Sequence, residues 1–444
     1  MSDRQVYSAA PERGVRGRAL VSTCALMLPC ARLASAGLTF GPPQTYVLQS
    51  AAQALVAEDF FGTGDLAIAG SQSASGTVVR LMNDGNGAFT VLGTAPVGPS
   101  PTCLAAGDMN GDGDPDLVAG SGSLNRITVL LNNGSGAFTS STIATISFTP
   151  AALALGDFDG DLDLDVAAAN ANSDSVWILL NDGSAVFGAP FAFPTGDKPW
   201  ALAAARLDAG ATIDLAVVNY LDGTVSVLFN AGNGTFTAGG TFTVGSRPTS
   251  IAAARLDADM LFDLVVTNSN SGAISILRNL GGGNFAPATN QYAGTQPGNV
   301  KTADLDFDGD VDIVVTNGAG NELSLFENNG GTHARQALAL GYRAGGLALA
   351  DYDGDMIPDL AVSSLTSSMI QVFINAAAPP PPPCIGDIDG DLDVDSTDLN
   401  ILLINFGQMV PPFTQGDLDG DGDVDSTDLN IELVNFGNDC NLPT

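Results

Sequence analysis

The stretch from Gly156 to Asn170, GDFDGDLDLDVAAAN, places five aspartates among nine residues directly before a run of small apolar residues. Related stretches recur along the chain, and their acidic parts end at Asp65, Asp116, Asp165, Asp214, Asp263, Asp312 and Asp359. The successive intervals are 51, 49, 49, 49, 49 and 47 residues. A nearly constant period of this length indicates a tandem array of similar supersecondary units. This repeat therefore decides the fold.

Each repeat contains four short segments of strand character. An apolar run precedes the acidic stretch, an alternating run follows it at 165–169, and another continues at 176–180. A glycine turn, NDGSAVF at 181–187, then leads to a fourth segment. Four short strands joined by glycine turns form one antiparallel sheet, and stacking such sheets radially protects their edges. The sequence therefore predicts an all-β seven-bladed propeller with four-stranded blades.

The phase of the repeat predicts how the ring closes. Five phenylalanines recur every 49 residues, at Phe89, Phe138, Phe187, Phe236 and Phe285. One step further back lies Phe40, within LTFGPPQTYVLQS at 38–50. We expect this segment to form a strand that completes the last blade, whose inner strands end near Asn375. An open β-solenoid is the alternative, but such an offset strand has no use in an open array.

A second repetition lies at the C-terminus. GDIDGDLDVDSTDLNILLINFG at 386–407 returns as GDLDGDGDVDSTDLNIELVNFG at 416–437, with 18 of 22 positions identical. The aspartates match the side-chain ligand positions of EF-hand calcium loops: Asp387, Asp389, Asp391, Asp395 and Asp398 in the first loop, and Asp417, Asp419, Asp421, Asp425 and Asp428 in the second. Loop position 6, where glycine eases the turn, is Gly422 in the second loop but Leu392 in the first. We therefore expect the first loop to bind calcium more weakly.

Most of the negative charge of the chain lies in the acidic loops. The net charge is −34, and of 44 aspartates, 25 lie in the seven loops and 12 in the terminal pair. Such acidity argues against nucleic-acid binding.

The ends of the chain predict export and a separate terminal module. Residues 1–36 combine arginines, an apolar run too short to span a membrane, and an A-x-A cleavage motif, as in a signal peptide for secretion. The propeller then covers 37–377, a proline-rich linker 378–383, and the terminal module 384–444. Cys384 and Cys440 bracket that module, which suggests a disulfide in an oxidising compartment. Cys103 aligns with small residues in other repeats, so we expect it in the core.

The acidic loops follow the pattern D-x-[DN]-x-D-x-x-x-D and resemble the FG-GAP or VCBS repeat propeller, the fold of the integrin α headpiece. This resemblance implies one calcium ion in each loop with a complete ligand set. The complete sets are Asp108, Asn110, Asp112 and Asp116; Asp157, Asp159, Asp161 and Asp165; Asp304, Asp306, Asp308 and Asp312; and Asp351, Asp353, Asp355 and Asp359. The first loop is two residues short, and Arg206 and Arg255 replace the first ligand of the fourth and fifth loops, where a guanidinium can pair with the remaining aspartates. We expect four Ca²⁺ ions here and two in the terminal loops, about six in all.

The terminal module resembles a type I dockerin, in which two calcium loops, each followed by a helix, bind a cohesin. The resemblance implies that cohesin contact centres on Ser396, Thr397, Ser426 and Thr427. The following segments carry Ile404–Asn405 and Val434–Asn435 where many such modules have Lys or Arg. The alternative is a calcium-stabilised terminal module without a cohesin partner.

Residues suited to catalysis are few, and we assign none. His333, the single histidine, falls in a predicted surface turn, and Trp177 in a predicted core run. Trp200 follows a proline at a position where other repeats hold Thr249 or Ala151, so we expect it to be exposed and to contact a ligand. The sequence thus predicts a secreted calcium-binding propeller that presents a binding face to a protein or glycan and is tethered by its terminal module. The alternative is a polysaccharide-degrading enzyme, a lyase or glycoside hydrolase.

Overall fold

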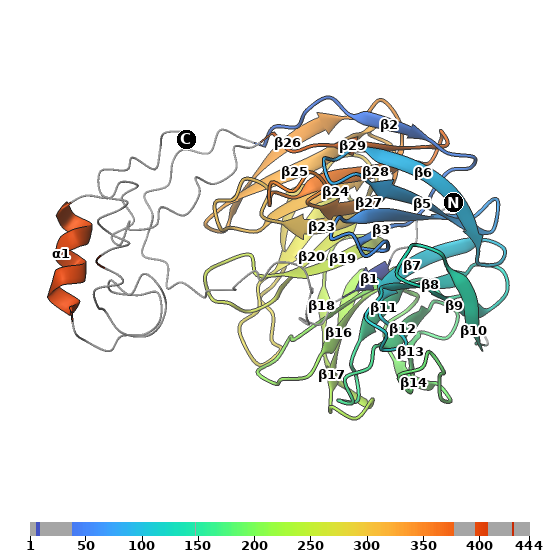
Figure 1. The fold of residues 1–444 in the computed structure, drawn as a ribbon. Coiled ribbons are helices and arrows are strands. Elements are labelled where there is room, and N and C mark those ends of the chain that lie inside the picture. The colour runs from blue at the N-terminus through green and yellow to red at the C-terminus, as the bar shows by residue number, and fades with distance from the viewer. Residues whose placement is uncertain (1–5, 9–37, 147, 377–395, 407–428, 430–444) are drawn as a thin grey trace. The chain divides into compact units, whose positions relative to one another are not determined.

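A computed structural model describes residues 6–8, 38–146, 148–376, 396–406 and 429 of the chain. The chain divides into two compact units, with 37–377 in the first and 378–444 in the second. The first unit consists of seven sheets arranged around a common centre (Figure 1). The predicted seven-bladed propeller is therefore confirmed.

Every blade is built from four antiparallel strands. The first three blades contain β3 (Leu55–Glu58), β4 (Ala67–Gln72), β5 (Thr77–Asn83) and β6 (Phe89–Pro96); β7 (Pro101–Gly107), β8 (Asp116–Ser121), β9 (Arg126–Leu131) and β10 (Thr139–Thr145); and β11 (Leu153–Gly156), β12 (Asp165–Asn170), β13 (Ser175–Leu179) and β14 (Phe191–Pro194). The next three contain β15 (Pro199–Ala205), β16 (Asp214–Asn219), β17 (Thr224–Asn230) and β18 (Phe236–Thr243); β19 (Pro248–Ala254), β20 (Asp263–Asn268), β21 (Ala273–Leu277) and β22 (Thr289–Tyr292); and β23 (Pro297–Ala303), β24 (Asp312–Asn317), β25 (Glu322–Asn329) and β26 (Thr332–Ala339).

The seventh blade closes the ring with a strand from the start of the propeller. Its inner strands are β27 (Ala344–Ala350), β28 (Asp359–Ser364) and β29 (Met369–Phe373), and its outer strand is β2 (Gln44–Val47). β2 pairs antiparallel with β29, and Phe40 bridges Asn375. The innermost strands contact one another around the ring, including β27 with β3. The predicted closure is confirmed, and the open solenoid is excluded.

How deeply a strand is buried depends on its position in the blade, because each blade packs between two neighbouring blades. The second strand of most blades begins at the last aspartate of the acidic loop, and strands such as β12 and β16 are buried along their whole length. Small apolar residues suit these positions because both faces of the strand pack against another sheet. The outermost strands, such as β18, expose most of their residues. Cys103 is fully buried in β7, as predicted.

Outside the propeller the described elements are short. α1 (Ser396–Asn405) coincides with the apolar segment after the first terminal loop, and Leu402 on it is buried. The ligand aspartates of the two terminal loops other than Asp398, both bracketing cysteines and the second Ser-Thr pair lie outside the described residues. Of the predicted signal peptide, only Val6–Ser8 are described, as strand β1 parallel to β11. Within the described residues no helix is long and apolar enough to cross a membrane.

Candidate functional site

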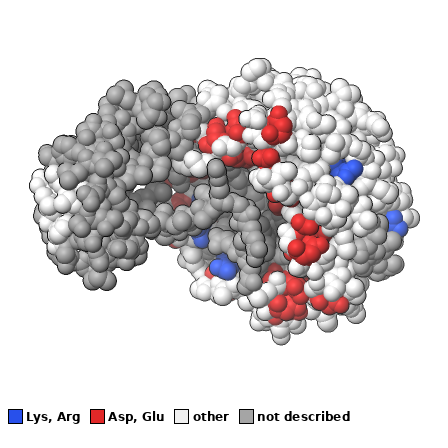
Figure 2. Space-filling model, in the orientation of Figure 1, with Lys and Arg blue, Asp and Glu red and all other residues white. Residues whose placement is uncertain are grey.

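The acidic loops connect the first and second strands of each blade, so all seven lie at the same end of the blades. The Asp and Glu side chains in Figure 2 gather in separate patches rather than spreading evenly. The first aspartate of a complete loop shapes its turn by accepting backbone hydrogen bonds. Asp108 accepts from the amides of Gly111 and Gly113, each at 2.8 Å, and Asp351 accepts from Gly354 at 2.7 Å and Met356 at 2.9 Å. These bonds fix the turn of the loop.

Three of the four complete loops bring carboxylates together as a metal site requires. One carboxylate oxygen from each member of a group lies within 4.8 Å of the others. The groups are Asp157, Asp159 and Asp165; Asp304, Asp306 and Asp308; and Asp351, Asp353 and Asp355. In the remaining complete loop, the amide nitrogen of Asn110 donates to Asp112 at 2.9 Å.

Several of these oxygens are buried without a hydrogen-bond partner. They are one oxygen of Asp159, one of Asp304 and both of Asp306. A buried carboxylate without a compensating charge or donor is strongly unfavourable. Hard oxygen ligands clustered at this spacing suit Ca²⁺, which takes six to eight such ligands. The chemistry of the loop therefore fits a calcium ion held by Asp304, Asp306 and Asp308, whose charge would offset their repulsion.

The last aspartate of each loop has a second role that the sequence pattern did not indicate. Asp312 is fully buried, and its two oxygens accept hydrogen bonds from the amides of Leu305 at 2.8 Å and Asn328 at 2.7 Å. The same pair of bonds occurs at Asp116, Asp165 and Asp359. Each carboxylate thus ties its own loop to the end of the third strand. Its oxygens keep further lone pairs for a metal.

Burial shifts the titration of these carboxyls. It raises the pKa of Asp312 to about 8 and the pKa of Asp116, Asp165 and Asp359 to about 7. Nearby carboxylates add to burial and raise the pKa of Asp308 to about 6. All these shifts disfavour the charged form, as expected for acids crowded together without a cation.

This crowding predicts an unusual pH dependence for the metal-free protein. A carboxyl whose pKa is higher in the folded state stabilises the fold below its unfolded pKa, and that stabilisation is lost as pH rises through the folded value. Metal-free protein prepared by dialysis should therefore melt at a higher temperature at pH 5 than at pH 8. Thermal unfolding across this range checks the sign, and excess calcium should remove the loss at pH 8. A metal-free melting temperature that rises from pH 5 to pH 8 would contradict the prediction.

The fourth and fifth loops differ from the complete ones. Arg206 and Arg255 are exposed, and Arg255 lies over the ring of Phe262 at 5.1 Å. In the fifth loop the cation is instead Arg278, which follows β21 and lies 2.6 Å from Asp263 and 3.4 Å from Asp257. A guanidinium thus pairs with aspartates of this loop, but Arg278 supplies it in place of the expected Arg255. The pattern within the loop could not show this, because Arg278 comes from the end of the third strand.

An asparagine in every blade connects it to the preceding blade. Each follows or ends the third strand, and its side-chain nitrogen donates to a backbone carbonyl of the neighbouring acidic loop at 2.7–3.1 Å. The pairs are Asn83 to Tyr352, Asn132 to Phe60, Asn181 to Met109, Asn230 to Phe158, Asn279 to Leu207, Asn328 to Leu256 and Asn375 to Leu305. We call these seven residues the asparagine ring. It crosses all seven interfaces, including the closure between the last and first blades.

The repeats place the chain in a known family. A family model for FG-GAP-like repeats matches residues 59–119, 108–168, 157–209, 255–315 and 304–362, which together cover more than half of the chain. The chain belongs to the FG-GAP-like repeat family. Residues 210–254, where the match is interrupted, begin within the fourth loop, in which arginine replaces the first ligand.

Solved structures with a similar fold share little sequence with this FG-GAP-like propeller. BBS1N in complex with ARL6DN has a TM-score of 0.57 and 10% identity, covering 76% of this chain and 96% of that one. Virginiamycin B lyase from Staphylococcus aureus has a TM-score of 0.52 and 13% identity, covering 76% of this chain and 99% of that one. These likenesses show the fold alone. No curated protein matches the chain significantly.

The end of the FG-GAP-like blades opposite the acidic loops carries an aromatic cluster in the fourth blade. The expectation that Trp200 is exposed was wrong, since only 5% of it is accessible. Tyr220, which follows β16, covers it, with ring centroids 5.1 Å apart and planes tilted by 31°. Lys198 lies over both rings, 5.5 Å from Trp200 and 5.3 Å from Tyr220. Arg247, from the connection to the fifth blade, lies 5.8 Å from Tyr220.

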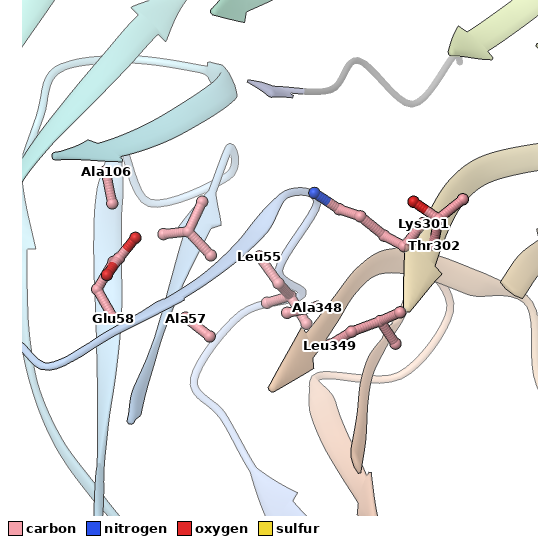
Figure 3. Close-up of a pocket in the computed structure, with 9 residues that line it drawn as sticks. Leu55, Ala57, Glu58, Ala106, Lys301, Thr302, Ala348 and Leu349 are labelled. Atoms are coloured by element: carbon pink, nitrogen blue, oxygen red, sulfur yellow. The ribbon is translucent and has the colours of Figure 1, made fainter. Parts of the chain in front are cut away.

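A cavity of about 180 Å³ lies among the innermost strands. Glu58 of β3 and Lys301 of β23 line it together with aliphatic residues and Thr302 (Figure 3). Burial, with Asp59 next to it, raises the pKa of Glu58 to about 7, and burial lowers the pKa of Lys301 to about 8. Where Lys301 lies in its blade, five others have alanine: Ala105, Ala154, Ala203, Ala252 and Ala348. The cavity has room for a small polar molecule.

His333 lies in β26 rather than in a surface turn, so that prediction was wrong. It is partly exposed, and its Nε2 is buried without a hydrogen-bond partner. Burial, with Arg278 nearby, lowers its pKa to about 4. The imidazole is therefore neutral at physiological pH.

Proposed function

We propose that this FG-GAP-like propeller is a calcium-stabilised binding module that presents a rigid face to a protein or glycan. The observation that carries the proposal is the loop of Asp304, Asp306 and Asp308, where three buried carboxylate oxygens have no hydrogen-bond partner. The geometry of the loop is suited to a bound Ca²⁺ ion rather than to catalysis. The remaining complete loops extend the proposal to four ions in the propeller. BBS1N, which has a similar fold, is solved in complex with the protein ARL6DN.

The terminal module extends this proposal to a tether. We infer two further Ca²⁺ ions in its loops, a Cys384–Cys440 disulfide, and export by residues 1–36. The near-identical loops support the calcium inference, and α1 begins at Ser396, one of the positions proposed to contact a cohesin. A propeller tethered in this way would deliver its binding face to an extracellular assembly.

Calorimetric titration of the full chain with calcium tests the proposal. We expect about six ions per chain, because four propeller loops and two terminal loops carry enough oxygen ligands. Substitution Asp306→Asn should remove one of them. A chain that binds no calcium, or an Asp306→Asn variant that binds as many ions as the parent, would contradict the propeller sites.

Two further assays test the proposed tether and the alternative function as a polysaccharide-degrading enzyme. Capture of the calcium-loaded chain by a type I cohesin, lost when chelator is added, is expected if the terminal module is a tether. Release of shorter sugars from a polysaccharide incubated with the chain would instead favour a polysaccharide-degrading enzyme.

A further inference from the structure

The cluster of Lys198, Trp200, Tyr220 and Arg247, which we call the aromatic-cation cluster, departs from the repeat that surrounds it. Positions that match Trp200 in other blades hold Thr102, Ala151, Thr249, Gly298 and Gly345. Positions that match Tyr220 hold Gly122, Ala171, Ser269, Gly318 and Leu365. Only the fourth blade therefore places two aromatic rings at this corner.

The fold of the corner does not require these rings. The amide of Tyr220 donates to the carbonyl of Lys198 at 3.0 Å, and the amide of Ser269 makes the matching bond to Arg247 at 3.0 Å. The same bond joins Gly122 to Ser100, Gly318 to Gln296 and Leu365 to Arg343. Because glycine, serine and leucine make the same backbone contact, the turn itself does not need an aromatic side chain.

The cluster places two cationic side chains beside one aromatic ring. Lys198 and Arg247 both lie over the ring of Tyr220, at 5.3 and 5.8 Å. Among the ion pairs of the described residues, none within 4.0 Å involves either cation. Both residues have positive φ, 62° and 54°, so each stands at a sharp turn of the backbone. Two cations beside one aromatic ring, without a carboxylate ion-pair partner, are suited to bind an anion.

The rim of the cluster limits which anion fits. Asp174 accepts a hydrogen bond from the amide of Lys198 at 2.9 Å, and Asp222 accepts one from the amide of Asp197 at 2.7 Å. These exposed carboxylates keep lone pairs for hydroxyl donors. They would repel a peptide that carries several carboxylates more strongly than a ligand that carries one. The surroundings therefore favour a ligand that carries one carboxylate among several hydroxyl groups.

We propose that the aromatic-cation cluster binds a uronate unit of an acidic polysaccharide, with its carboxylate between Lys198 and Arg247 and its hydroxyl groups toward Asp174 and Asp222. This inference rests on the proposed binding function and names the ligand class and the face. It is independent of the calcium loops, which lie at the other end of the blades.

Calorimetry on the calcium-loaded full chain tests it, with a trimer of galacturonate as probe and a trimer of galactose as neutral control. We expect the galacturonate trimer to bind and the galactose trimer to bind at least about tenfold more weakly, a difference of about 1.4 kcal/mol. The double variant Lys198→Ser with Arg247→Ser should lose a similar factor. Serine already stands at the matching position Ser100, so the variant should fold.

Arg343→Ser provides the matched control, because Arg343 occupies the same corner of the seventh blade, where Gly345 and Leu365 stand at the positions of Trp200 and Tyr220. Its affinity for the probe should equal that of the parent chain. The inference is overturned if the galacturonate trimer does not bind, if the double variant binds it unchanged, or if an oligomer of glutamate binds better. The calcium titration is read separately, so a chain that binds calcium but no uronate refutes this inference and leaves the calcium sites intact.

Discussion

Replacing Asp306 by asparagine is expected to destabilise the calcium-loaded propeller while leaving the calcium-free propeller unchanged or more stable. Both oxygens of Asp306 are buried without a hydrogen-bond partner, and they share their loop with Asp304 and Asp308. Without metal, the substitution removes one of three repelling charges. With metal, it removes a charged ligand, and a hundredfold loss of calcium affinity corresponds to about 2.7 kcal/mol of lost stabilisation at saturation.

Chemical unfolding of parent and variant, in excess calcium and after chelation, measures this reversal of sign. Asp259→Asn is the control. Asp259 aligns with Asp308, the next ligand position, and lies in the fifth loop, where Arg278 already neutralises Asp257 and Asp263. Its effect on the free energy of unfolding should be small and the same with and without calcium. If Asp306→Asn destabilised the chain equally in both conditions, the loop would be a structural turn and not a metal site.

The architecture could be predicted from the sequence because it follows from the repeat. A period of 49 residues determined the number of blades, and the phase of Phe40 showed that β2 closes the seventh blade. The acidic loops could also be predicted from the sequence, since the proposed ligands of each loop lie within nine residues of one another. These features depend on short stretches of chain, so spacing alone predicts them.

The features that the sequence did not show depend on contacts between different strands of one blade or between neighbouring blades. Trp200 was expected to be exposed because other repeats hold Thr249 or Ala151 at its position, but Tyr220, twenty residues later, covers it. Arg278 pairs with Asp257 from the end of the third strand, so it lies outside the sequence pattern of the acidic loop. The asparagine ring was hidden in turn sequences such as NDGSAVF, where asparagine is expected for the turn itself. Its periodicity of 49 residues was present, but its partners lie 72 residues earlier in the chain.

Substitution Asn181→Ala should lower the free energy of unfolding by about 2–4 kcal/mol. The side-chain nitrogen of Asn181 donates to the carbonyl of Met109 at 2.8 Å and to the carbonyl of Leu164 at 3.1 Å, and the residue is buried. Alanine leaves two buried carbonyls without these donors, and each such loss costs about 1–3 kcal/mol. Asn133→Ala is the control, because Asn133 is exposed and bonds only within its own turn in the described structure. Equal unfolding curves for Asn181→Ala and Asn133→Ala would contradict a stabilising role.

The position of Asn83 makes this prediction a test of the closed ring. Asn83 donates to Tyr352 at 2.8 Å across the closure between the first and last blades, and to Leu66 at 3.2 Å within its own blade. In a closed ring every interface is internal, so Asn83→Ala should destabilise as much as Asn181→Ala. If blade contacts depended only on sequence neighbours, Asn83→Ala would lose its intrablade bond alone and cost about half as much. Comparable losses, measured by denaturant unfolding with unchanged m-values, would show that residues 269 positions apart stabilise the propeller as strongly as adjacent repeats do.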